Sequence, residues 1–67
     1  MPAAIDLEGG SVLLVAGEPA DLATLLGHHA PETGLIEVSV SGGASAWVNP
    51  RLVAAVRPLR FDEAFSE

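Results

Sequence analysis

The chain is short, apolar and acidic: it has 67 residues, 49% of them hydrophobic, with a formal net charge of −6 and no cysteine. A chain of this length forms one domain with a marginal core, because it buries only roughly 60% of its unfolded surface. The composition excludes disulfides and thiolate metal sites, no apolar run reaches the ~18 residues of a membrane span, and the N-terminus lacks a signal-peptide pattern. We therefore expect a cytoplasmic protein without membrane contact.

The first part of the chain predicts a β-hairpin. Apolar and acidic residues alternate over residues 5–8, as in a strand with one buried face. Gly9 and Gly10 can adopt the positive φ angles of a two-residue turn. Residues 11–15 form the return strand, which is apolar from residue 12 onward and is therefore expected to be covered on both faces.

A short helix is predicted after Gly17. Pro19 suits the first helical turn, where its missing N–H costs nothing. Gly27 and then Pro31 limit the helix at its C-terminal end. A helix of two to three turns is too short to stand alone and must pack on the sheet. The leucines at helical spacing predict one apolar stripe: Leu22, Leu25 and Leu26.

Residues 35–48 predict a second hairpin that turns at Gly42 and Gly43. The alternation places Ala46 and Val48 on one face of the return strand, and Ser45 and Trp47 on the other. This hairpin resembles the first at an offset of 33 residues, which aligns Gly9 with Gly42. The offset indicates either an internal repeat or the likeness of any two hairpins with a Gly-Gly turn.

A capped helical turn is predicted at Asn49 and Pro50, because Asn is a favoured N-cap and Pro is favoured at the first helical position. Val53 and Val56 lie three residues apart, so one tight turn would point both at the core. A last strand follows over residues 55–61, with Pro58 placing it at a sheet edge.

These elements predict a single small α+β domain over residues 1–61, with the order β-β-α-β-β-β. We expect a curved antiparallel sheet or small open barrel with one helix packed on it. Residues 62–67 form an acidic tail that we expect to be frayed and flexible. Phe65 is the exception within the tail, since a lone aromatic side chain there can dock on a neighbour.

The stretch VSVSGGASAWVNPRLVAAV combines a strand, a Gly-Gly turn and the Asn-Pro corner. Residues 36–57 thereby resemble small bacterial proteins of the FlbD type, in which a strand and a polar turn lead to a V-N-P-x-x-I corner. The same element occurs in other small β modules, including the LytTR DNA-binding domain. The resemblance implies a small β-rich bacterial fold and transfers no functional site, because the shared residues are structural. This chain departs from the pattern in being less charged and in having an extra hairpin and helix before it.

Few residues could carry chemistry. His28 and His29 are the only candidate metal or acid–base pair, with Glu32 as a further ligand at a site shared between subunits. Adjacent helical residues diverge by about 100°, however, which favours exposed histidines at a helix end. The Gly-Gly pairs lack the lysine and following helix of a phosphate loop, and no serine has a signature placing a base beside it. We expect no enzyme activity, no cofactor and no bound metal.

The basic residues all follow residue 50, whereas residues 1–50 carry six acids and no Lys or Arg. This charge distribution disfavours nucleic acid as a partner. We favour pairing of Arg51, Arg57 and Arg60 with acids of a neighbouring subunit. One alternative is a nucleic-acid-binding regulator that uses these arginines, with Trp47 or Phe61 stacking on bases. Another is an inhibitor whose acids mimic nucleic acid.

The hydrophobic content of so small a chain favours a homo-oligomer. If Ala46 and Val48 face the core, Trp47 faces outward, where Trp is a common interface anchor; the reversed assignment would place it in the monomer core. We expect a non-enzymatic, self-associating interaction module, structural or regulatory, whose further protein partner is unknown. The residues assigned to the interface are Trp47, Arg51, Arg57, Arg60 and Phe61, and the structural ones are Gly42, Gly43, Asn49 and Pro50.

Overall fold

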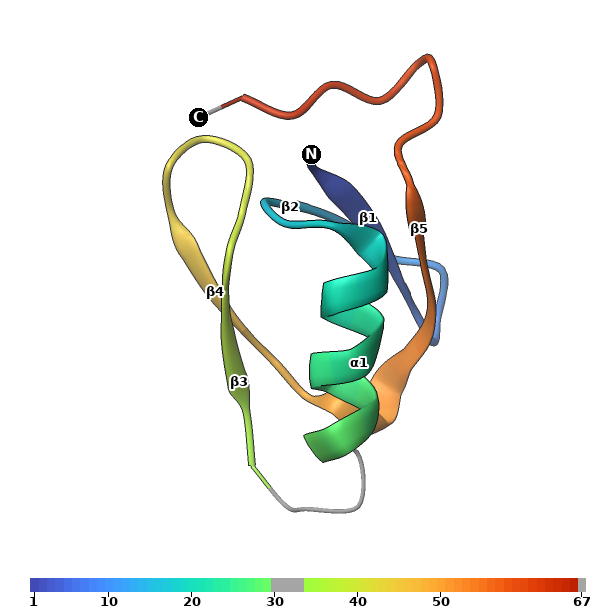
Figure 1. Cartoon of the computed structure of the whole chain (residues 1–67), viewed down its shortest axis with the longest axis vertical. Coiled ribbons are helices and arrows are strands. Elements are labelled where there is room, and N and C mark those ends of the chain that lie inside the picture. The colour runs from blue at the N-terminus through green and yellow to red at the C-terminus, as the bar shows by residue number, and fades with distance from the viewer. Residues whose placement is uncertain (30–33, 67) are drawn as a thin grey trace.

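A computed structural model describes residues 1–29 and 34–66 (Figure 1). The chain has the predicted α+β fold, with one α-helix, one 3₁₀ turn and strands in two antiparallel sheets. Within the described residues, no helix has both the length and the apolar character needed to cross a bilayer. In chain order, the elements are β1 (Ala3–Leu7), β2 (Val12–Val15), α1 (Pro19–His29), β3 (Ile36–Ser39), β4 (Ser45–Val48), η1 (Pro50–Leu52) and β5 (Val53–Pro58).

The sheets are a three-stranded one with the order β2-β1-β5 and the pair β3-β4. An antiparallel bridge between Val15 and Val40 joins them where β2 and β3 end. Two backbone hydrogen bonds support this junction: Ala16 N donates to Ser39 O at 2.9 Å, and Ser41 N donates to Leu14 O at 3.0 Å. Across the two sheets, the strands therefore lie in the order β4-β3-β2-β1-β5, and β4 and β5 are the outermost strands.

Both predicted hairpins form, and both have the same loop. Leu7 N donates to Ser11 O at 2.8 Å, and 33 residues later Val40 N donates to Ala44 O at 2.9 Å. Each loop therefore contains three residues, one more than the predicted two-residue turn. The glycines that end each loop have φ angles of 96° and 91° in the first hairpin, and 95° and 79° in the second. The cross-strand register is also the same in both hairpins.

Helix α1 begins at Pro19, as predicted, and continues through Gly27 to His29. Leu22 and Leu26 are buried, whereas Leu25 is 41% exposed. The predicted three-leucine stripe was therefore wrong at Leu25: residues four apart lie nearly in line along a helix, and Leu25 lies on the flank of that line. Pro31, the predicted stop, lies outside the described residues.

The corner between β4 and β5 has the predicted cap. The Asn49 side chain accepts a hydrogen bond from Arg51 N at 3.0 Å, and the buried Pro50 opens η1. Because Asn49 has extended backbone angles, its oxygen can reach the free N–H groups of the turn. Leu52 O accepts a bond from Glu8 N at 2.8 Å, which ties the corner to the loop of the first hairpin.

Strand β5 is an outer strand, as predicted, but it covers Val53–Pro58 rather than residues 55–61. Leu7 faces Val53 and Asp6 faces Ala55, so the register shift leaves one residue, Ala54, as a β-bulge. The bulge lets Val53 and Val56 both pack against the core despite their odd spacing. A bulge in a strand, and not the predicted tight turn, accounts for the inward direction of both valines.

The core is shared by α1 and both sheets. Ile5 and Val15 are its largest fully buried side chains, and β1 is buried from Ala3 to Ile5 because β2 and β5 flank it. Strand β2 is covered less completely than predicted, since Val12 is exposed and burial is complete only at Val15. The core cluster comprises Ala3, Ile5, Val15, Leu22, Leu26, Val38 and Val48.

Candidate interaction surface and the Arg57 ion network

The outer face of the second hairpin exposes the only tryptophan. Trp47 lies directly across from Glu37 in β3, and its side chain is 62% exposed. Leu35, two residues before Glu37 in the same alternation, is 58% exposed. On the opposite face, Val38 and Val48 are buried in the core. Trp47 therefore points outward, and its role in an interface stays a prediction. We use the name outer face for Leu35, Glu37, Ser39, Ser45 and Trp47.

Other exposed apolar side chains are distributed over the molecule. Single exposed apolar residues are normal for a protein surface. The outer face differs from them because it presents a large aromatic side chain on a sheet surface, with a second exposed apolar residue, Leu35, directly before β3. Exposed large apolar side chains elsewhere are Met1, Val12, Leu25, Leu52 and Phe61.

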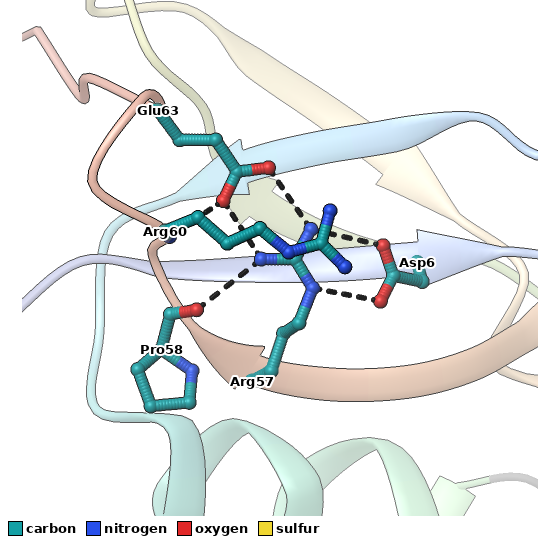
Figure 2. A network of polar contacts seen from close by, with 5 residues as sticks. All are labelled: Asp6, Arg57, Pro58, Arg60 and Glu63. Carbon is teal, nitrogen blue, oxygen red and sulfur yellow. Dashed lines mark hydrogen bonds and ion pairs between the residues drawn. The ribbon is translucent and has the colours of Figure 1, made fainter.

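Arg57 forms an ion network within its own chain (Figure 2). Its Nε and Nη2 donate to the two carboxylate oxygens of Asp6, at 2.9 and 3.2 Å. Its Nη1 and Nη2 donate to the two carboxylate oxygens of Glu63, at 2.7 and 2.9 Å. Nη1 also donates to Pro58 O at 3.3 Å. A guanidinium has five N–H donors in a fixed fork, so this arrangement engages its full donor capacity.

The register of the sheet places these groups together. Arg57 lies across from Ala4 in β1, and Asp6 is two residues further along the same face of β1. Glu63 arrives from the turn after β5, where Arg60 N donates to its carboxylate at 2.8 Å. The hydrogen bonds from Arg57, and then from the Arg60 backbone, lower the pKa of Glu63 to about 2. The carboxylates of Glu63 and Asp6 raise the pKa of Arg57 above its usual range.

This network bears on the predicted partners of Arg51, Arg57 and Arg60. Arg57 is only 17% exposed and pairs with acids of its own chain, whereas the sequence favoured acids of a neighbouring subunit. The side chains of Arg51 and Arg60 are exposed. Asp6 and Glu63 are not among the residues predicted from the sequence to form a site, since no local spacing links residue 6 to residue 57. The sequence signal for Glu63 was the acidic stretch that begins a few residues after Arg57 and Pro58.

The C-terminal segment, residues 59–66, runs back over the molecule. Figure 1 shows it as the red trace from β5 to the tip of the β3–β4 hairpin. Ser66 N donates to Ser41 Oγ at 2.9 Å, and Gly42 N donates to Ser66 O at 2.5 Å. Phe65 is half-buried and lines a hollow of about 130 Å³ with Met1, Pro2, Ala16 and Gly17. These contacts differ from the frayed tail expected from the sequence.

Two further open hollows lie among the described residues. A groove of about 260 Å³ between α1 and β5 is lined mainly by small and aliphatic side chains. Another hollow, of about 230 Å³, lies beside Pro19 and Pro58. Among the residues that the structure describes, no three His, Asp or Glu side chains are placed to hold a metal ion. His28 is exposed, and Glu32 of the predicted alternative lies outside the described residues.

No family model, curated protein or solved structure matches this chain. The resemblance of residues 36–57 to FlbD-type proteins therefore stays a prediction.

Proposed function

We propose that this protein is a non-enzymatic interaction module that self-associates through its outer face, with Trp47 as the anchor. The observation that supports this proposal is the 62% exposure of Trp47 on a sheet face, with Leu35, 58% exposed, directly before the facing strand. Tryptophan is enriched among the residues that dominate binding energy at protein interfaces. A monomer of this size gains from covering such a face, because its own core is small.

The charges around the anchor favour a second copy as the occupant. Glu37 lies across from Trp47, and the exposed Arg51 lies four residues after Trp47 in the chain. In a twofold dimer, the same patch meets itself, so an acid and a base near one anchor can pair with the base and acid of the other copy. Nucleic acid is less favoured, because the Arg57 charge is already matched by two carboxylates of its own chain.

A structural or regulatory accessory role fits such a surface. The module would act by bringing chains together, and further partners would bind the assembled form. The Arg57 ion network joins segments of the fold to one another, which fits a structural role for these charges.

The test compares Trp47→Ala with the matched control Leu25→Ala, which removes an exposed leucine from α1. Light scattering of the wild type at micromolar concentration should give at least twice the 6.8 kDa chain mass. Trp47→Ala should lower that mass to the monomer value with its far-UV circular dichroism retained, and Leu25→Ala should leave the mass unchanged. On dilution of the wild type, Trp fluorescence should shift to the red. A monomeric wild type, or an oligomer indifferent to Trp47→Ala, overturns the proposal.

A further inference from the structure

The C-terminal segment is held at three separate points, all on the part of the chain that precedes it. Glu63 binds Arg57 through two hydrogen bonds, Phe65 contributes to the hollow beside Ala16, and Ser66 is bound to the loop of the second hairpin. The segment-binding surface therefore consists of Arg57, the hollow of Met1, Pro2, Ala16 and Gly17, and the loop residues Ser41 and Gly42. It recognises a carboxylate followed two residues later by an aromatic ring.

The link between β5 and these contacts is a single tight turn. Glu63 N donates to Arg60 O at 3.0 Å, which closes a four-residue turn directly after Leu59. Phe61 lies within this turn with its ring fully exposed to water. The turn thus holds an aromatic side chain in solvent, while the residues beyond it make specific contacts. A short hinge of this kind can open and exchange the segment beyond it between two copies of a chain.

We propose that the C-terminal segment is exchanged between two copies of this chain. When the turn at residues 60–63 opens, residues 63–66 of each copy bind the segment-binding surface of the other. The contacts that residues 63–66 make with residues 1–57 are reproduced in the exchanged dimer, because the segment-binding surface lies wholly within residues 1–57. The hydrogen bond from Glu63 N to Arg60 O within the turn is given up. The pairing of the Glu63 carboxylate with the Arg57 guanidinium is the charge complementarity that selects this occupant.

This contact is independent of the outer face and does not involve Trp47. In the monomer, the segment binds its own chain, and this intramolecular linkage corresponds to an effective concentration on the order of 1 mM. Exchange therefore becomes substantial when the protein concentration approaches that value. The product is a twofold dimer in which both segments cross over.

The experiment uses full-length single-cysteine variants, since the native chain has no cysteine. Ser66 N donates to Ser41 Oγ at 2.9 Å, so these two contacting residues are chosen as the cysteine positions. Chains carrying Ser41→Cys are mixed with chains carrying Ser66→Cys at about 1 mM, and oxidised. The covalent heterodimer is quantified by mass. The control mixture pairs Ser66→Cys with Ser11→Cys, an exposed position directly after the loop of the first hairpin.

Exchange requires several-fold more heterodimer from the Ser41→Cys mixture than from the control, and loss of the excess when Phe65→Ala is added to the Ser66→Cys chain. Equal yields from the two mixtures overturn exchange. A single chain carrying both Ser41→Cys and Ser66→Cys should close an internal disulfide in dilute solution, which verifies the bonding geometry; a chain that fails to close it also counts against the segment-binding surface.

Repeating the mixtures in the Trp47→Ala background separates the two proposals. An excess of heterodimer that persists there supports exchange whatever the fate of the outer-face proposal. Equal yields, together with a Trp47-dependent oligomer in light scattering, would overturn exchange and leave the proposed function standing.

Discussion

The first hairpin, β1–β2, and the second, β3–β4, share a loop and a register, and they differ in what covers their outer faces. Ile5 and Val38 are equivalent positions on the inner faces, and both are buried. On the outer faces, the pair Ala4–Leu14 corresponds to the pair Glu37–Trp47. Ala4 is fully buried and Leu14 half-buried, whereas Glu37 and Trp47 are both exposed.

The difference follows from the order of the strands. Strand β1 lies between β2 and β5, so its outer face meets Arg57, and the ion network holds Glu63 of the C-terminal segment there. Strand β4 is an outermost strand, and within the described residues only β3 pairs with it. The same local pattern thus produces a covered face in one place and an open face in the other, and position in the sheet decides which.

The largest expected effect comes from the shared inner face. Ile5→Ala should lower the free energy of unfolding by about 2–5 kcal/mol, because it leaves a cavity in a fully buried site. Urea denaturation measures the loss. The control is Leu25→Ala on the exposed flank of α1, where a change within about 0.5 kcal/mol is expected. Equal losses at both positions would contradict the packing described for the core.

The two loops should respond alike to a side chain. Gly9→Ala and Gly42→Ala each force an L-residue to a φ near 95°, and an added Cβ would meet no atom within 4 Å at either site. The backbone alone then sets the cost, at about 1–2 kcal/mol each. Denaturation midpoints of the two variants should agree closely. A large difference between them would mean that the two loops are not equivalent.

Local sequence signals predicted the elements of both hairpins, the start of α1 and the Asn49 cap, because each depends on neighbours within a few residues. The loop length was missed by one residue, since Gly-Gly suits more than one turn type. The bulge at Ala54 was missed because the register against β1 creates it. Strand alternation predicted an outward Trp47 on the condition that Val48 faces the core, and Val48 is buried there.

The Arg57 network could not be predicted in the same way. Asp6 and Arg57 are brought together by the pairing of the first strand with the last, a contact between residues far apart in the chain. The position of the C-terminal segment depends in turn on that network and on the loop of the second hairpin. Its acidic composition predicted a solvated tail, and only the folded arrangement provides the cation and the hollow that hold it.

A smaller effect is expected at the corner, which follows the second hairpin and has no counterpart after the first. Asn49→Ala removes the acceptor for Arg51 N and should cost about 1 kcal/mol. Asn49→Asp keeps an acceptor and serves as the matched control, with little loss expected. An unchanged urea midpoint for Asn49→Ala would contradict the capping role.

The smallest effect on stability is expected at acidic pH and concerns the Glu63–Arg57 ion pair at the outer face of β1. Because the pKa of Glu63 falls from an ordinary 4.5 to about 2 on folding, its ion pair stabilises the native state fully above pH 4.5, and this contribution is lost as the pH falls toward 2. Glu63→Gln should lower the urea midpoint at neutral pH and weaken its dependence on pH in that window. Parallel pH profiles for the variant and the wild type would contradict this assignment.

The bulge at Ala54 has a consequence for the free edge of the three-stranded sheet. An outermost strand offers unpaired backbone groups to any passing strand, and a regular edge can nucleate fibrils. In β5, the bulge interrupts the regular spacing of those groups near one end, and Pro58 removes a donor at the other. Addition of a further strand at this edge is thereby disfavoured at both ends of β5.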